Sequence, residues 1–232
     1  ASATVRDTGA LDLGIVSVSG NLWVTAGGAI SDSGTLSVGG STQISATGKA
    51  VVLDGANDFT GAISISAVSA TVCDTGDITL AASNLSETLQ IWSGGSIELA
   101  SLPSSPELQL VAAESIHFDA SLQLPYEVLT LQASMSLGSS TVPLQLSGRT
   151  LTLKSTAGQV FAQLHGDSAV SVEVFGAQGA DIQHAGTLRF ASGSSVVSST
   201  GSIAVRALNE MWVSGLAVHA KSARLEAGQS IK

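Results

Sequence analysis

Short alternations of apolar and polar residues recur along this chain at a constant interval. They open with Ile78, Ile97, Ile116 and Met135, which are equally spaced, and the pairs Leu89-Ile91 and Leu108-Leu110 keep the same interval half a period away. Alternate residues of an extended strand point to opposite faces, so each alternation predicts a strand with one buried face. A period of about 20 residues with several strands per period is typical of a solenoid.

The pattern therefore predicts an all-β fold, a parallel β-helix of about 11 or 12 coils with roughly 19–22 residues each. Equivalent strands of successive coils pair about 4.8 Å apart. We expect Ile78, Ile97, Ile116 and Met135 to form one ladder inside the tube.

A glycine stands two places before the first inward residue of many coils, from Gly9 and Gly20 through to Gly201. This position suits a corner where φ is positive or where a Cβ would clash with the neighbouring coil. Its persistence predicts a single β-solenoid domain over residues 1–232. Regular coils occupy residues 1–100, looped coils 101–148 and further coils 149–232.

Aromatic residues supply the candidate surface contacts. Proline cannot donate to a strand ladder, so Pro103, Pro106 and Pro125 predict loops near residues 102–107 and 121–126. Such loops often carry binding residues, which makes Tyr126 a candidate contact at the surface. The remaining candidates alternate with inward apolar neighbours and are expected outside, where they could stack on sugars: Trp23, Trp92 and Trp212.

Neither end of the chain shows an amphipathic helix that would cap a solenoid. Uncapped coils present unpaired strand edges. The chain is therefore expected to be cut from a longer rod or to stack end to end with other copies. The candidate stacking residues are Leu11, Leu13, Leu225 and Ile231.

Four segments within the first 100 residues carry a family resemblance. Residues 7–14, with the sequence Asp-Thr-Gly-Ala-Leu-Asp-Leu-Gly, and residues 57–63, with Asn-Asp-Phe-Thr-Gly-Ala-Ile, resemble the repeats of filamentous-haemagglutinin-type exoproteins, as do residues 16–22 and 26–30 between them. The resemblance implies a right-handed β-helix that a Gram-negative bacterium secretes across its outer membrane, usually by a two-partner route. It also implies a place outside the cell or on its outer surface, with roles in adhesion, biofilm or toxin delivery.

Charge is sparse and unevenly distributed. Charged residues make up 12% of the chain and the net charge is −9, against about 25% charged residues in an average globular domain. Residues 50–148 contain ten acids and no Lys or Arg, whereas residues 149–232 sum to +2. Without a basic stripe, nucleic acid is not an expected partner. No apolar run approaches the roughly 18 residues of a membrane span, so membrane insertion is not expected either.

Candidate chemistry is scarce. The acids Asp77, Glu98 and Asp119 are equally spaced and could form one outward row, but no Lys or Arg lies near them to stabilise a developing anion. The single cysteine, Cys73, is expected to be a small, half-buried apolar residue. The histidines, expected at surfaces or turns, show no metal-ligand spacing: His117, His165, His184 and His219. We therefore expect no catalytic residue, cofactor or metal.

The sequence favours an extracellular structural or adhesive β-solenoid segment of a bacterial surface or secreted exoprotein. Its expected partners are adjoining coils or other copies, and glycans or proteins of cell surfaces. The alternative is a filament subunit that assembles end to end through its uncapped coils.

Overall fold

The computed structural model describes residues 1–118, 123–166 and 169–232. Contacts divide the chain into two compact units, Ala1–Asp119 (unit 1) and Ala120–Lys232 (unit 2). Every regular element in the described residues is a strand, and the coils number about 11, with roughly 20 residues each. None of the described residues belongs to a helix that could span a bilayer. The predicted parallel solenoid is confirmed, while one continuous domain over residues 1–232 stays a prediction.

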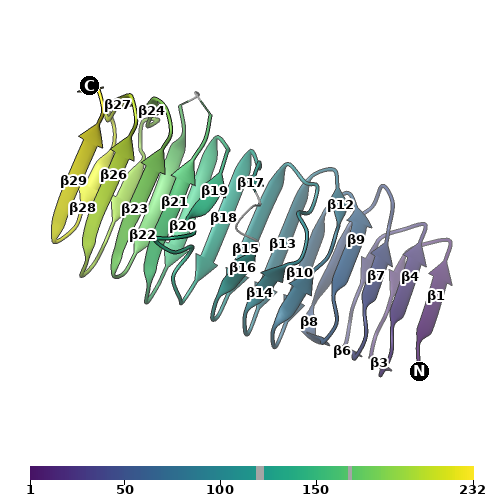
Figure 1. Ribbon diagram of the computed structural model, residues 1–232. Helices are drawn as coiled ribbons and strands as arrows, with labels where there is room; N and C mark the ends of the chain where they lie inside the picture. Colours follow the sequence, from purple (N-terminus) through teal and green to yellow (C-terminus); the bar gives the residue numbers. More distant parts are fainter. Residues whose placement is uncertain (119–122, 167–168) are drawn as a thin grey trace. The chain divides into compact units, whose positions relative to one another are not determined.

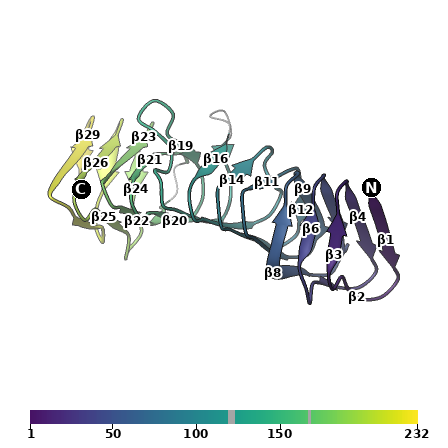
Figure 2. The same cartoon turned by 90° about the horizontal axis from the view of Figure 1, so that it is seen from below.

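Unit 1 contains three rows of parallel strands (Figures 1 and 2). The first row holds β1 (Ala3–Asp7), β4 (Leu22–Ala26), β7 (Thr42–Ser45), β9 (Ile63–Ala67), β11 (Ile78–Leu80), β14 (Ile97–Leu99) and β16 (Ile116–Phe118), with β12 (Asn84–Leu85) also beside β9. The second row holds β2 (Leu11–Asp12), β5 (Ile30–Ser31), β8 (Val51–Phe59), β10 (Ala70–Asp74), β13 (Thr88–Ser93) and β15 (Glu107–Ala112). The third holds β3 (Val16–Val18), β6 (Leu36–Val38) and the end of β8.

Unit 2 repeats this arrangement. One row holds β17 (Gln123–Leu124), β19 (Leu144–Leu146), β21 (Gln159–Leu164), β23 (Gly179–His184), β26 (Ser202–Ala207) and β29 (Ser222–Ala227). A second holds β18 (Val128–Ala133), β20 (Thr150–Ser155), β22 (Ser171–Gly176), β25 (Ser195–Val197) and β28 (Ala217–His219). A third holds β24 (Leu188–Arg189), β27 (Glu210–Trp212) and β30 (Ser230–Ile231).

The register between these coils of unit 1 follows the spacing of the isoleucines. Ile78, Ile97 and Ile116 are direct partners and all three are buried, which confirms their ladder. Each fully buried side chain of this kind contributes about 1.5–3 kcal/mol. The prediction for Met135 is wrong, because its side chain is 58% exposed. It lies in the turn after β18, and Leu137, two residues later, takes the buried position instead.

Buried polar side chains close the corners of unit 1. Asn57 is fully buried, and its Oδ1 accepts the backbone N–H of Leu36 at 2.8 Å. Its Nδ2 donates to Asp32 at 2.7 Å and to the carbonyl oxygen of Leu53 at 3.2 Å. One side chain thus satisfies two backbone groups that a bend in the chain takes out of the strand ladders.

Corner glycines are required by close approach between coils. At Gly20 a Cβ would lie 2.8 Å from the carbonyl oxygen of Ala1, and at Gly201 it would overlap the carbonyl oxygen of Gln178. Neither glycine has a positive φ. Of the two reasons expected for these positions, the steric one therefore holds.

Thr42 carries an inward hydroxyl with no hydrogen-bond partner among the described residues. Thr42→Val keeps the shape of the side chain and removes a buried polar group that water no longer solvates. We expect the free energy of unfolding to rise by about 1 kcal/mol in urea titrations. Thr25→Val, at an exposed position of β4, is the matched control and should change stability by less than about 0.5 kcal/mol. A fall in stability for Thr42→Val would contradict this account.

Asn57→Ala tests how much the hydrogen bonds of this buried side chain contribute to stability. It leaves the buried N–H of Leu36 and the carbonyl of Leu53 without this partner, so we expect the free energy of unfolding to fall by about 3 kcal/mol. Gln43→Ala, at an exposed position of β7, should have little effect in the same urea titration. If Asn57→Ala lowered the free energy of unfolding no more than Gln43→Ala does, the Asn57 hydrogen bonds would not be needed for stability.

Candidate functional site

The tryptophans stand on three different sheets, with Trp23 and Trp92 in unit 1 and Trp212 in unit 2. Trp23 on β4 is 38% exposed, in register with Thr4 and Gln43 of the adjoining coils. Trp92 on β13 is half-buried between Cys73 and Val111. Both rings project outward from their strands, as the alternation predicts.

The indole ring of Trp212 already contacts charged side chains. The guanidinium carbon of Arg189 lies 4.7 Å from the centre of its ring and the Nζ of Lys232 lies 4.8 Å from it. Its Nε1–H donates to Glu210 at 3.3 Å. Cations favour the face of an indole ring, so a sugar would have to displace these contacts. Trp23 is therefore the most accessible of the three platforms.

The expectation that Tyr126 is a surface residue is wrong. Its side chain is 2% exposed, and desolvation raises the pKa of its hydroxyl. Tyr126 lies just before β18, where its ring joins the buried side chains of the coil because burial of a large aromatic surface is favourable. Of the loop expected at residues 121–126, residues 121 and 122 lie outside the described residues.

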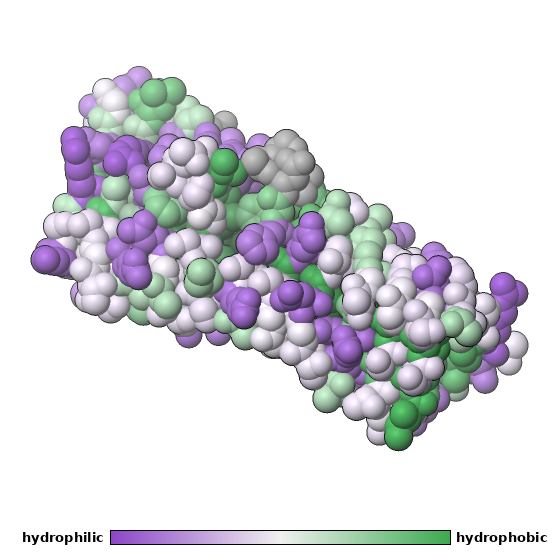
Figure 3. Space-filling view, turned by 60° about the horizontal axis from the view of Figure 1, so that its bottom comes forward, coloured by the Kyte–Doolittle hydropathy of each residue, from purple (hydrophilic) through white to green (hydrophobic). Residues whose placement is uncertain are grey.

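The candidate stacking residues lie at the first and last coils that the structure describes. Leu11, Leu13 and Leu225 are half-buried, and Ile231 is exposed. Figure 3 shows hydrophobic side chains gathered at the end of unit 1 that holds β1 to β3, on its right. Ile15, which sequence analysis did not single out, lies in that coil and is 82% exposed.

Asp77 and Glu98 do not line up in the row that their spacing allows. Thr79, rather than Asp77, is in register with Glu98, and His117 follows in the next coil. The coils there are shorter than the spacing of the acids, so these side chains fall out of line. Asp119 lies outside the described residues. In the described part of the chain, no group of three or more His, Cys, Asp or Glu side chains is placed to hold a metal ion.

Cys73 is half-buried, as expected. Desolvation raises the pKa of its thiol, and the nearby carboxylates Asp54 and Asp32 raise it further. A thiol with a raised pKa is a poor nucleophile at neutral pH.

A groove lies on the sheet of unit 1 that carries Trp23. We call it the polar groove, with a volume of about 390 Å³. It is lined by Ser45, Thr47, Gly48, Ser66, Ala67, Val68, Asn84 and Ser86. Ser45 is in register with Ser66, and Ser66 with Asn84, so that the groove follows the stacking direction over three coils. Trp23 lies on the coil before Ser45, two residues earlier along its strand.

The groove exists because one coil departs from the regular pattern. Between β11 and β12 the chain leaves the sheet, and the N–H of Ile65 on β9 loses a strand partner there. The Oγ of Ser83 accepts this N–H at 3.0 Å and donates to the carbonyl oxygen of Ala81 at 3.1 Å. The Ser83 side chain thus replaces the missing strand partner of Ile65, and Asn84 and Ser86, which follow it, line the groove.

Sequence analysis identified Trp23 but missed the polar groove. The available signal was the outward series Ser45, Ser66 and Asn84, whose members are unequally spaced. Unequal intervals hide such a row, because the coil lengths must be known before outward residues can be aligned.

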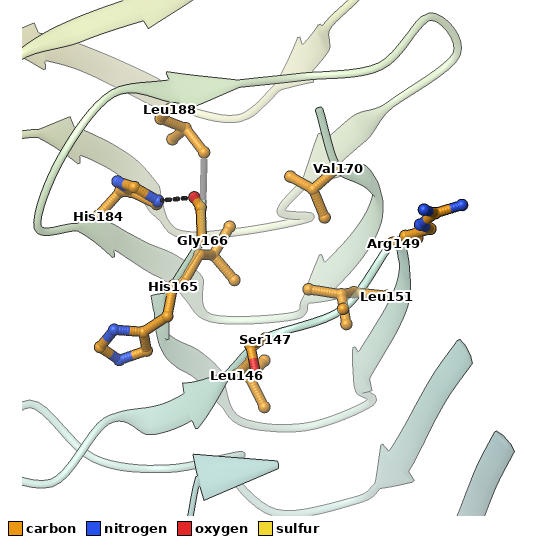
Figure 4. Close-up of a pocket in the computed structure, with 11 residues that line it drawn as sticks. Leu146, Ser147, Arg149, Leu151, His165, Gly166, Val170, His184 and Leu188 are labelled. Atoms are coloured by element: carbon orange, nitrogen blue, oxygen red, sulfur yellow. Dashed lines mark hydrogen bonds between the residues drawn. The ribbon is translucent and has the colours of Figure 1, made fainter. Parts of the chain in front are cut away.

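Unit 2 contains a second, smaller pocket of about 190 Å³ (Figure 4). Leu151, Val170 and Leu188 line its interior, and Arg149 points away from it. His165 lines the same pocket, with its Nε2 2.7 Å from Oε1 of Gln145.

His184 is buried beside this pocket, so its predicted place at a surface or turn is wrong. Its Nδ1 accepts the N–H of Gly186 at 2.9 Å, which assigns the ring proton to Nε2. Nε2–H then donates to the carbonyl oxygen of Gly166 at 2.8 Å, the dashed line in Figure 4. The ring thereby joins two successive coils.

His165 gives unit 2 a pH-dependent stability. Burial lowers the pKa of His165 from its usual value of 6.5, and the neighbouring His184 acts in the same direction. As the pH falls below about 6.5, the unfolded chain binds the proton before the folded chain does, so stability is lost toward acid. We expect the fall in urea midpoint between pH 7.5 and pH 5 to be smaller in His165→Gln than in the unmodified chain. An unchanged fall, matching that of the exposed control His117→Gln, would contradict this.

Comparison with known proteins identifies a repeat at the start of the chain. Residues 1–66 match the family model described as "Repeats of unknown function (DUF5649)". No curated protein and no solved structure matches the chain. The matched residues run from β1 into β9, over the coils in which the corner glycines are most regular. The match and the parallel stack together show a repeat protein with a β-solenoid fold.

Proposed function

We propose that this β-solenoid is a structural and adhesive segment of a bacterial exoprotein and contacts cell surfaces through the side of its coils. The observation that carries the proposal is the exposed Trp23 beside the polar groove on one sheet of unit 1. The likeness of residues 7–14 and 57–63 to haemagglutinin-type repeats supports a place outside the cell. We propose secretion by a Gram-negative bacterium on the same ground.

The scaffold suits adhesion because it holds its outer side chains rigidly. Strands β4, β7 and β9 pair along their length, so Trp23, Gln43 and Ser64 keep a fixed spacing of about 4.8 Å. A ligand that binds such a surface loses its own freedom but does not have to order the protein. Preorganisation of this kind favours affinity.

A second candidate function, end-to-end assembly, is favoured by the apolar side chains of the terminal coils. Leu11, Leu13 and Ile15 are only half-buried or exposed, and β2 pairs with β5 on one side alone in this structure. Either adjoining coils or another copy would cover these groups and extend the ladder. Negative-stain microscopy over a range of concentrations separates this function from adhesion, because filament subunits form fibres one solenoid wide, whereas adhesive segments stay as discrete particles.

Adhesion is tested with the purified chain coupled to beads and incubated with bacterial and epithelial cells. Trp23→Ala should weaken attachment about 30-fold, which corresponds to the roughly 2 kcal/mol or more typical of an aromatic contact at the centre of an interface. Gln90→Ala, at an outward position of β13 on another sheet, is the control and should bind as the unmodified chain does. Attachment that is absent in the unmodified chain, or unaffected by Trp23→Ala, would overturn the proposal.

A further inference from the structure

The polar groove differs from one outward row on the neighbouring sheet of unit 1 in how its side chains are used. On the neighbouring sheet the outward side chains bond to one another along the stack. Thr71 donates to Gln90 at 3.4 Å, and Gln90 donates to Gln109 at 3.1 Å. The polar groups of such a row bond to one another, so fewer donors and acceptors remain free to bind a ligand.

In the groove, five polar side chains make no side-chain hydrogen bond to any described protein group. They are Ser45, Thr47, Ser66, Asn84 and Ser86. Four hydroxyls and one carboxamide therefore face a shared hollow with both donors and acceptors available. Three of them are held at the coil spacing by in-register backbone pairing.

The groove has no charged lining residue, although unit 1 is rich in acids. A charged ligand entering it would lose water without gaining an ion pair, and that loss is costly. A ligand with many neutral hydroxyls loses water too, but it regains hydrogen bonds to hydroxyl and carboxamide groups. The groove therefore selects by charge as well as by shape.

Apolar side chains in and near the groove match the apolar faces of sugar rings. Ala67 and Val68 line the groove, and Trp23 stands exposed on the same sheet one coil before Ser45. Sugar rings combine hydroxyl edges with apolar C–H faces, and an indole ring provides a flat partner for such a face.

We propose that the polar groove is a binding site for a neutral oligosaccharide that lies along the stacking direction. Its hydroxyls bond to Ser45, Ser66 and Asn84, and an end of the sugar chain reaches toward Trp23. This inference rests on the proposed adhesive function and adds the site and the chemical class of its ligand.

The test measures binding of the unmodified chain to neutral hexasaccharides (cellohexaose, mannohexaose and maltohexaose) and to acidic comparators, oligogalacturonate and heparin fragments. We expect at least one neutral sugar to bind and the acidic ones not to. The double variant Ser45→Val/Ser66→Val should weaken neutral binding by about tenfold, through loss of its hydrogen bonds. Valine is favoured in strands, so the variant is expected to fold. Ser37→Val, at an exposed position of β6, is the matched control and should bind normally.

The outcomes separate the two proposals. Neutral binding that survives the double variant, preference for acidic sugars, or no sugar binding while Trp23-dependent cell attachment persists would overturn the inference and leave adhesion standing. If the unmodified chain neither attached to cells nor bound any sugar, both the adhesive function and the inference would be overturned. A Ser66→Glu variant gives an independent check, because a carboxylate in the groove should abolish neutral binding only if the ligand enters it.

Discussion

In-register parallel pairing between successive coils is the interaction on which every other feature depends. Each strand in the middle of a unit donates and accepts backbone hydrogen bonds on both sides, as β10 does with β8 and β13. The pairing fixes equivalent residues about 4.8 Å apart, so one apolar position repeated in each coil becomes a continuous core. The same constraint aligns the outward side chains, which is how a surface row arises without any contact between its members.

Corners are where this pairing is most costly to maintain, because a turning chain takes backbone groups out of the ladder. The protein meets the cost with glycines where coils approach closely and with buried polar side chains where backbone groups need partners. Asn57 serves Leu36 and Leu53, and Ser83 serves Ile65. In unit 2 His184 has a comparable place, joining Gly166 to the next coil. A residue type that suggests chemistry in a sequence can thus have a structural role.

The proposed binding surface arises from an irregularity in the same framework. A coil that bulges between β11 and β12 opens the polar groove, and the regular coils on either side of it supply Ser45, Ser66 and the exposed Trp23. On the neighbouring sheet, where the coils are regular, Thr71, Gln90 and Gln109 form a row that bonds to itself. Departures from the repeat are therefore where a solenoid can acquire selectivity.

The sequence by itself determined the strand type, the parallel stacking and the ladder of Ile78, Ile97 and Ile116, because burial of alternate residues repeats with the coil. It placed Tyr126 at the surface because Pro125 predicts a loop, but a residue in such a connection can still turn a large aromatic side chain into the core. It placed Met135 on the wrong side, since a local change in coil length alters which residues face inward without changing their local pattern. Only the tertiary structure aligned Ser45, Ser66 and Asn84, for the same reason. Residues at such unequal spacings become neighbours only after each coil has set its own length.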